Sequence, residues 1–153
     1  MVIKVKPTQT SKSLLNLNMQ NSKKHIKVVA AIIFHDDSVY CFRKGQNKYE
    51  YLANKFEFPG GKIEPQENKK QALEREILEE LNVKILVKDE LIEIEHEYPD
   101  FTLTMAFFAC EIKSGIIKLS EHTEVVLEPI DRIKELDWLP ADVPAVEYLV
   151  ENF

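Results

Sequence analysis

The sequence predicts an α/β fold in which a mixed β-sheet is sandwiched between helices. Residues 27–34 form an almost unbroken apolar, β-branched run, as expected of a strand buried on both faces. Residues 69–81 carry an apolar stripe at helical spacing, and a further helix is expected from Asp142 to the C-terminus. Because strands are mixed with helical segments along the chain, helices packed on a mixed sheet are the expected architecture.

The strands follow from apolar runs that are separated by turn residues. They are expected at 27–34, 39–43, 55–58, 83–95, 101–112 and 125–127. Tyr98, Pro99 and Asp100 separate the two longest runs and predict a hairpin turn. A polar loop is expected at 44–54, and a short helix at 131–136.

The helix at 69–81 has recognisable start and stop signals. Asn68 with Gln71 three positions later resembles a capping box, and Asn82 can end the helix in left-handed geometry. The apolar stripe lies between these signals and consists of Ala72, Leu73, Ile77 and Leu81.

The chain has 153 residues, which is the size of one domain. Residues 1–24 are polar and predict a flexible N-terminal extension, so the ordered domain is expected at 25–153. Cys41 and Cys110 both lie in apolar runs, which indicates buried thiols in a reduced, cytoplasmic protein. No apolar stretch approaches the length of a membrane span, so no membrane partner is expected.

The net charge is −6, from 20 basic and 26 acidic side chains. An acidic surface disfavours binding to a nucleic-acid polymer, whose affinity comes mainly from Lys and Arg. A small phosphorylated ligand remains compatible with this charge, provided that it arrives with a divalent cation.

Three carboxylates share one face of the predicted helix, because Glu76, Glu79 and Glu80 fall at i, i+3 and i+4. Like charges at this spacing cost roughly 0.2–0.5 kcal/mol per pair. A solvated acidic face is one interpretation. The other is a site for Mg²⁺, or Mn²⁺ as an alternative, because these cations prefer hard oxygen ligands. Gly60 and Gly61 upstream favour the second interpretation, because they let the backbone approach a ligand closely.

The spacing of these residues resembles the Nudix box, G-x5-E-x7-R-E-U-x-E-E-x-G-U, where U is aliphatic. Gly61, Glu67, Arg75 and the three helix glutamates occupy its fixed positions, and Val83 ends it. The one departure is Asn82 in place of the last glycine, and Asn tolerates the left-handed conformation best among the other residues. The resemblance implies the Nudix fold and a metal-dependent hydrolase.

The resemblance continues outside the box. Residues 53–64 are similar to the MutT branch, which sanitises oxidised nucleotides, and residues 140–144 to the CTP pyrophosphohydrolase branch. Both branches convert a (d)NTP to the monophosphate and pyrophosphate. The implied substrates are 8-oxo-dGTP, or (d)CTP and modified cytosine analogues. A Nudix pyrophosphatase of ADP-ribose or a dinucleotide, and a non-catalytic nucleotide sensor, are the alternatives.

The resemblance also implies roles for individual residues. Glu79 and Glu80 would be the main metal ligands, with the Gly60 carbonyl, while Glu76 would hold a further ion or act on the attacking water. Arg75 would orient the glutamates, and Glu67 would support the loop or the outer metal shell. A later acidic residue is also expected at the metal, and the position of Glu124 fits it, with Glu121 and Glu128 as rivals.

Substrate contacts are expected beyond the box. Arg43, Lys44 and Lys62 are candidate triphosphate contacts, and Gly61 a backbone contact. Asp142 aligns with the position where the MutT branch reads the oxidised purine through an amide, although Asp142 could equally be an ordinary helix N-cap. Phe58 and residues 101–105 are candidate walls of the base pocket. The protein is expected to be a monomer or a homodimer.

Overall fold

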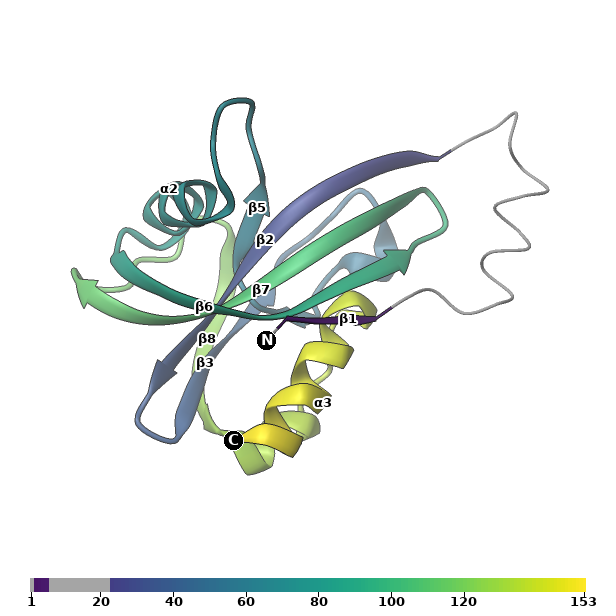
Figure 1. Ribbon diagram of the computed structural model, residues 1–153. Coiled ribbons are helices and arrows are strands. Elements are labelled where there is room, and N and C mark those ends of the chain that lie inside the picture. Colours follow the sequence, from purple (N-terminus) through teal and green to yellow (C-terminus); the bar gives the residue numbers. More distant parts are fainter. Residues whose placement is uncertain (1, 6–22) are drawn as a thin grey trace.

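Strand β2 (Lys24–His35) is the central strand, and its middle is buried on both faces as the apolar run predicts. The computed structural model describes residues 2–5 and 23–153. Alternate residues of β2 belong to two hydrophobic clusters, with Val29, Ala31 and Ile33 in one and Ala30 and Ile32 in the other. The first cluster includes side chains of α2 (Lys69–Leu81), and the second includes side chains of α3 (Val143–Asn152). The two helices therefore cover opposite faces of the sheet (Figure 1).

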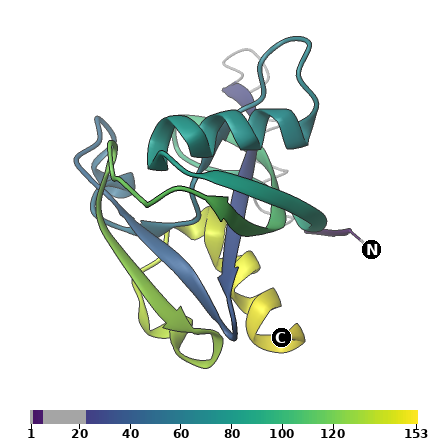
Figure 2. The ribbon, with the colours of Figure 1, turned by 90° about the vertical axis from the view of Figure 1, so that its left-hand side faces the viewer.

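The other strands, in chain order, are β1 (Ile3–Val5), β3 (Ser38–Lys44), β4 (Phe56–Glu57), β5 (Gly60–Lys62), β6 (Lys84–Glu97), β7 (Phe101–Ser114) and β8 (His122–Pro129). Within the described residues the sheet runs β1-β6-β7-β2-β3-β4, with β5 paired to β2 and β8 paired to β3. The β6–β7 pair is antiparallel and the β7–β2 pair is parallel. The predicted mixed sheet between helices is therefore confirmed (Figure 2).

Helix α2 has the bounds that the sequence predicts, and its capping signals are formed. The Asn68 side chain accepts a hydrogen bond from the Gln71 backbone N–H, and the Gln71 side chain accepts one from the Asn68 N–H. Asn82 ends the helix with φ 58° and ψ 31°, the left-handed conformation that its type tolerates.

The C-terminal end of α2 also holds the loop 115–121 that leads into β8. The backbone N–H of Lys118 donates to the Leu81 carbonyl at 2.9 Å, and that of Ser120 donates to the Glu80 carbonyl at 3.3 Å. The Ser120 hydroxyl donates to the same Glu80 carbonyl at 2.9 Å. These bonds use carbonyl groups that a helix end leaves without intrahelical partners, and they bring Glu121 close to α2.

Gly60 and Gly61 are required for space and not for an unusual backbone conformation. Both lie in β5, and neither has a positive φ. A Cβ on Gly60 would overlap the Val29 carbonyl oxygen, and a Cβ on Gly61 would overlap the Glu76 carboxylate. The backbone at these glycines thus lies close to strand β2, at Gly60, and to the Glu76 side chain of α2, at Gly61.

Several element boundaries differ from those expected. The strand expected at 55–58 ends at Glu57, because the backbone N–H of Phe58 donates to the Asp142 side chain and not to a neighbouring strand. The helix expected at 131–136 is a 3₁₀ helix, η3 (Ile130–Glu135). Two more 3₁₀ turns are η2 (Glu50–Leu52), in the predicted polar loop, and η4 (Pro140–Asp142), directly before α3.

The N-terminal segment 1–24 is predicted to be a flexible extension. Most of this segment, residue 1 and residues 6–22, lies outside the described residues. Its described part includes β1, which pairs in parallel with β6 through Ile3 and Ile92. Among the residues that the structure describes, no helix has the length and apolar character needed to cross a membrane.

Candidate active site

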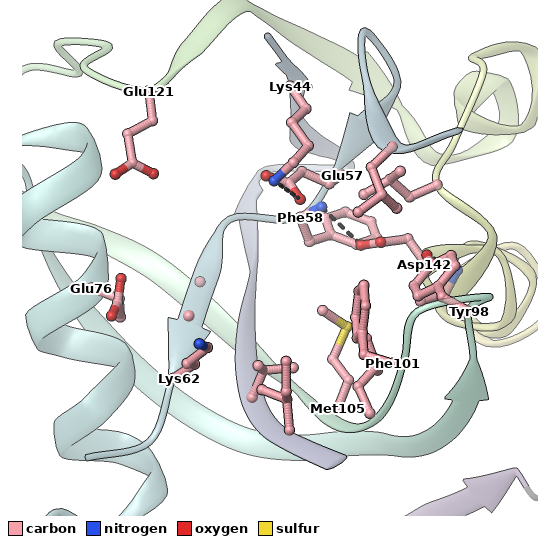
Figure 3. A pocket seen from close by; sticks show the side chains of 18 of the residues that line it. Lys44, Glu57, Phe58, Lys62, Glu76, Tyr98, Phe101, Met105, Glu121 and Asp142 are labelled. Carbon is pink, nitrogen blue, oxygen red and sulfur yellow. Dashed lines mark hydrogen bonds and ion pairs between the residues drawn. The ribbon is translucent and has the colours of Figure 1, made fainter. Parts of the chain in front are cut away.

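A cavity of about 340 Å³ opens between α2, the β2–β7 pair and the C-terminal segment (Figure 3). Parallel pairing of β2 with β7 places Ile26 beside Leu103 and Val28 beside Met105, and these four side chains line one wall. The lining includes eight of the predicted site residues, Lys44, Phe58, Gly60, Gly61, Lys62, Glu76, Glu80 and Asp142, and also Phe101, Leu103 and Met105 of the predicted wall 101–105. The cavity has an acidic end beside α2 and an apolar end beside η4.

Four glutamates line the cavity: Glu76, Glu80 and Glu121 toward the end beside α2, and Glu57 toward the middle. Glu80 is 7% exposed, and its Oε2 atom is buried without a hydrogen-bond partner. Burial, followed by repulsion from Glu121, Glu57 and Glu76, raises the pKa of Glu80 to about 9. Lys44 acts in the opposite direction but does not compensate for these effects. Ionised Glu80 thus lacks a sufficient positive partner here.

The donor set at this end fits a divalent cation. An unpartnered carboxylate oxygen on Glu80 and the neighbouring acidic side chains are hard ligands of the kind that Mg²⁺ and Mn²⁺ take. Within residues 2–5 and 23–153, no three acidic, His or Cys side chains are gathered closely enough to enclose an ion by themselves. A cation bound here would therefore share its coordination with a ligand, as Mg²⁺ commonly does with substrate phosphates.

Arg75 lies outside the cavity lining and donates hydrogen bonds to several residues of the box. Its Nε donates to Glu67 Oε2 at 2.7 Å, and its Nη1 donates to Glu76 Oε1 at 2.8 Å. Its Nη2 donates to Glu67 Oε1 at 2.9 Å and to the Lys62 carbonyl at 3.1 Å. Hydrogen bonds from Arg75, and then from the Glu64 backbone N–H, lower the pKa of Glu67 to about 2. The ion pair thus connects the start of the box to helix α2.

Besides Arg75 and Glu67, three more of the predicted residues lie away from the cavity lining. The Glu79 side chain is 60% exposed, and Arg75 Nη1 lies 3.5 Å from its Oε2. Glu124 pairs with Arg43 instead, with 3.5 Å between Oε2 and Nη1. The Arg43 guanidinium lies over the Phe56 ring at 5.0 Å from its centroid. The acidic residue that β8 and its preceding loop bring to the cavity is Glu121.

The apolar end is a slot of aliphatic and aromatic side chains. Phe58 packs against Trp138, with ring centroids 4.6 Å apart, and edge-on against Phe107 at 6.1 Å. Phe101 and Met105 face it from β7 (Figure 3). Flat apolar walls of this kind suit an aromatic ring system.

Asp142 is a fully buried acid at the end of this slot. Its Oδ1 accepts a hydrogen bond from the Phe58 N–H at 3.0 Å, and its Oδ2 has no partner. Burial, and then the nearby Glu57 carboxylate, raises the pKa of Asp142 well above its usual value. Asp142 does occupy the N-cap position of α3, but its side chain makes no cap hydrogen bond, so it does not act as an ordinary cap.

The structure adds two polar cavity residues that are not among the predicted site residues, Glu57 and Tyr98. Glu57 accepts a hydrogen bond from His122 and projects into the middle of the cavity. Tyr98 is buried, and its hydroxyl oxygen accepts a hydrogen bond from the Ala141 backbone N–H at 3.0 Å. One sequence signal for Glu57 is its position as a charged residue between two aromatic residues in a short apolar run.

This geometry can be compared with known proteins. A family model described as the NUDIX domain matches residues 28–148. The CTP pyrophosphohydrolase of Escherichia coli is 30% identical over 124 residues, which are 81% of this chain and 90% of that protein. The 8-oxo-dGTP diphosphatase of Buchnera aphidicola (Acyrthosiphon pisum) is 41% identical over 103 residues, which are 67% of this chain and 83% of that protein.

A solved structure agrees with these sequence relatives. The solution structure of a MutT protein of the Nudix hydrolase family from methicillin-resistant Staphylococcus aureus is 37% identical, with a TM-score of 0.69. The similarity covers 86% of this chain and 99% of that one. This chain therefore belongs to the Nudix family, among its MutT-like hydrolases.

Proposed function

We propose that this protein hydrolyses a nucleoside triphosphate to the monophosphate and pyrophosphate, with Mg²⁺ or Mn²⁺ bound together with the triphosphate. One observation carries the proposal: a single cavity joins a group of carboxylates to an apolar slot that ends at the buried Asp142. A metal–triphosphate group suits the first end, and a nucleobase suits the second. The proposed substrates are 8-oxo-dGTP, or (d)CTP and its modified analogues.

Residues of α2 and of the loop 115–121 would hold the cation. The ligands would be Glu76, Glu79 and Glu80, together with the Gly60 carbonyl. Glu121 is favoured over Glu124 as the further acidic ligand, because Glu121 lines the cavity. The bound cation would supply charge neutralisation, polarisation of a phosphoryl oxygen and a bound water of lowered pKa. Arg75 would keep Glu76 in place through its 2.8 Å hydrogen bond.

Lysines at the cavity would contact the triphosphate. Lys44 and Lys62 both line the cavity, and neither is buried. Their positive charge would offset the repulsion between an anionic substrate and the surrounding carboxylates. Arg43 is a weaker candidate, because it pairs with Glu124 and stacks on Phe56.

Asp142 would read the base through its free Oδ2 atom. In the protonated form this carboxyl group donates one hydrogen bond, and in the ionised form it only accepts. The protonated form would donate to a base carbonyl or ring nitrogen, and the ionised form would accept from an exocyclic amino group. Oxidised guanine and cytosine both offer such partners, so both remain in the proposal.

The test is a substrate panel with the purified full-length protein and Mg²⁺. Release of pyrophosphate and monophosphate is measured for 8-oxo-dGTP, dGTP, dCTP, CTP and 5-methyl-dCTP, with Glu80→Gln as the inactive control. No pyrophosphate from any of these would refute the proposal. Two monophosphates from ADP-ribose or a dinucleotide would identify the other kind of Nudix pyrophosphatase. Turnover that Glu80→Gln leaves unchanged would indicate contamination and favour a nucleotide sensor.

A cytoplasmic location and a monomeric or homodimeric state belong to the same proposal. Cys41 and Cys110 are both free and buried, which supports a reducing compartment. Sedimentation at two protein concentrations, with and without Mg²⁺ and nucleotide, distinguishes monomer from dimer.

A further inference from the structure

Glu57 occupies the middle of the cavity. Figure 3 shows it beside Lys44, between Glu76 and Glu121 on the one hand and Asp142 on the other. It comes from β4, directly before Phe58, which forms a wall of the apolar slot. A ligand that fills the cavity from end to end must therefore pass Glu57.

His122 fixes the orientation of this carboxylate. The His122 side chain is 3% exposed, and its Nε2 lies 2.9 Å from Glu57 Oε2. Because an ionised carboxylate only accepts hydrogen bonds, Nε2 must carry the hydrogen. The imidazole ring also packs against Phe42, with 5.3 Å between the ring centroids. His122 is therefore held by packing while it holds Glu57.

The other Glu57 oxygen keeps accepting capacity for a ligand. Lys44 Nζ lies 3.8 Å from Glu57 Oε1, which is an ion pair but too long for a hydrogen bond. A carboxylate offers about four acceptor positions. His122 uses one of them, so the cavity side of Glu57 can still accept.

The chemistry of the cavity indicates which part of a nucleotide Glu57 meets. A phosphate would be repelled by a carboxylate, and the acidic residues nearer to α2 are Glu76, Glu80 and Glu121. The base fits the apolar slot next to Asp142. The segment that joins phosphate to base is the sugar, whose hydroxyl groups are neutral donors and suit a carboxylate acceptor.

We propose that Glu57 accepts a hydrogen bond from a sugar hydroxyl of the nucleotide, with His122 as the residue that positions it. The inference rests on the proposed function for the kind of ligand, but it can be measured by binding without turnover. Trp138, the only tryptophan, packs on Phe58 and reports occupancy of the slot through its fluorescence.

The experiment compares four sugar forms of one nucleoside monophosphate: ribose, 2′-deoxy, 3′-deoxy and 2′,3′-dideoxy. Their Kd values are measured without metal by Trp138 fluorescence and calorimetry, and kcat/KM is measured for the matching triphosphates. In the wild type, loss of the contacted hydroxyl should weaken binding about tenfold or more. In Glu57→Gln this effect of the hydroxyl group should fall below about threefold, because a neutral amide that faces the sugar lacks the charge of the carboxylate and makes a weaker hydrogen bond.

Two His122 variants separate positioning from packing. His122→Phe keeps a ring beside Phe42 but has no donor. Its affinity should therefore depend as little on the sugar hydroxyl as that of Glu57→Gln. His122→Gln retains a donor near the Nε2 position, so removal of the contacted hydroxyl should again weaken binding almost as much as in the wild type. Two exposed positions away from the cavity supply matched controls that should behave as wild type: His35→Asn at the end of β2 and Glu95→Gln in β6.

Three results would overturn the inference. The first is a wild type that binds all four sugar forms equally or binds none. The second is a hydroxyl penalty that Glu57→Gln leaves unchanged. The third is a Glu57→Gln variant whose only defect is a larger Mg²⁺ requirement, which would assign Glu57 to the cation. The protein could also hydrolyse no triphosphate and still show sugar-dependent binding that disappears in Glu57→Gln. That result would support this inference and refute only the proposed function.

Discussion

The Asp142 carboxylate and the Phe58 backbone N–H form a buried 3.0 Å hydrogen bond between positions 84 residues apart in sequence. This bond ends strand β4, fixes an aromatic wall of the cavity and leaves the second oxygen of Asp142, a cavity-lining residue, without a hydrogen-bond partner. A single buried side chain thus connects the C-terminal segment to the strand that leads into the Nudix box.

Asp142→Ala is expected to lower the free energy of unfolding by about 1–3 kcal/mol, because it leaves the buried Phe58 N–H without an acceptor. Asp142→Asn keeps an acceptor oxygen and should cost less than half as much. Urea unfolding of both variants without ligand measures the difference. Equal stability of the two would show that the hydrogen bond contributes little. In the substrate panel, Asp142→Asn should change the ratio of kcat/KM between 8-oxo-dGTP and dCTP, and an unchanged ratio would remove Asp142 from base recognition.

Glu80→Gln is expected to abolish hydrolysis and yet stabilise the metal-free protein. Because the folded-state pKa of Glu80, about 9, lies above the unfolded value of about 4.3, ionisation of this group opposes folding. The destabilisation caused by ionised Glu80 is absent below about pH 4, grows as the pH rises and levels off above about pH 9. The variant should therefore be more stable than wild type near pH 8, on the order of 1–3 kcal/mol, and equally stable near pH 4.

Thermal unfolding in EDTA from pH 4 to 9 measures this difference for wild type and Glu80→Gln. Mg²⁺ with nucleotide should then raise the Tm of wild type more than that of the variant, because the cation stabilises the ionised form. A Glu80→Gln protein less stable than wild type at every pH would contradict the burial argument.

Glu67 should show the opposite pH dependence. Its folded-state pKa, about 2, lies below the unfolded value, so its ion pair with Arg75 stabilises the fold above about pH 4.3. That stabilisation is lost as the pH falls toward 2. Glu67→Gln should lower the Tm near pH 7, and the difference from wild type should vanish near pH 2. Exposed Glu95→Gln is the control, and a Tm difference that does not depend on pH would indicate lost packing instead of lost charge.

The two glycines of β5 should respond differently to alanine. In Gly60→Ala the new methyl group meets the backbone of β2, which cannot move aside, so the fold should be destabilised. In Gly61→Ala it meets the end of the Glu76 side chain, which can rotate away. Gly61→Ala should therefore retain most of its stability but lose at least about tenfold in kcat, because catalytic groups tolerate little displacement. Circular dichroism melts and pyrophosphate release measure the two effects, and a folded, fully active Gly61→Ala would contradict the argument.

The elements set by local chemistry are the ones the sequence predicts well. Helix α2 has the predicted bounds because its stripe and both of its caps lie within fifteen consecutive positions, 68–82. The two-sided burial of β2 follows from its unbroken apolar run. The mixed sheet follows from these elements and the hairpin of β6 and β7.

The features that depend on contacts between distant positions could not be predicted from the sequence. Arg43 and Lys44 flank an irregularity in the β3–β8 pairing, where Arg43 opposes Glu124 but Lys44 opposes His122. Simple alternation along β8 therefore does not reveal that His122 turns inward, or that Glu121 and not Glu124 lines the cavity. The burial of Asp142 likewise depends on Phe58, which is remote in sequence.

The attachment of the loop 115–121 to the end of α2 has a consequence for how this protein can vary. Two of the bonds that hold Glu121 near the helix come from backbone N–H groups, at Lys118 and Ser120. Substitutions other than proline leave a backbone N–H in place, whereas an inserted or deleted residue shifts every donor relative to its acceptor. Among related sequences, the side chains of this loop other than Gly115, Ser120 and Glu121 are therefore free to vary, while its length should be under the stronger selection.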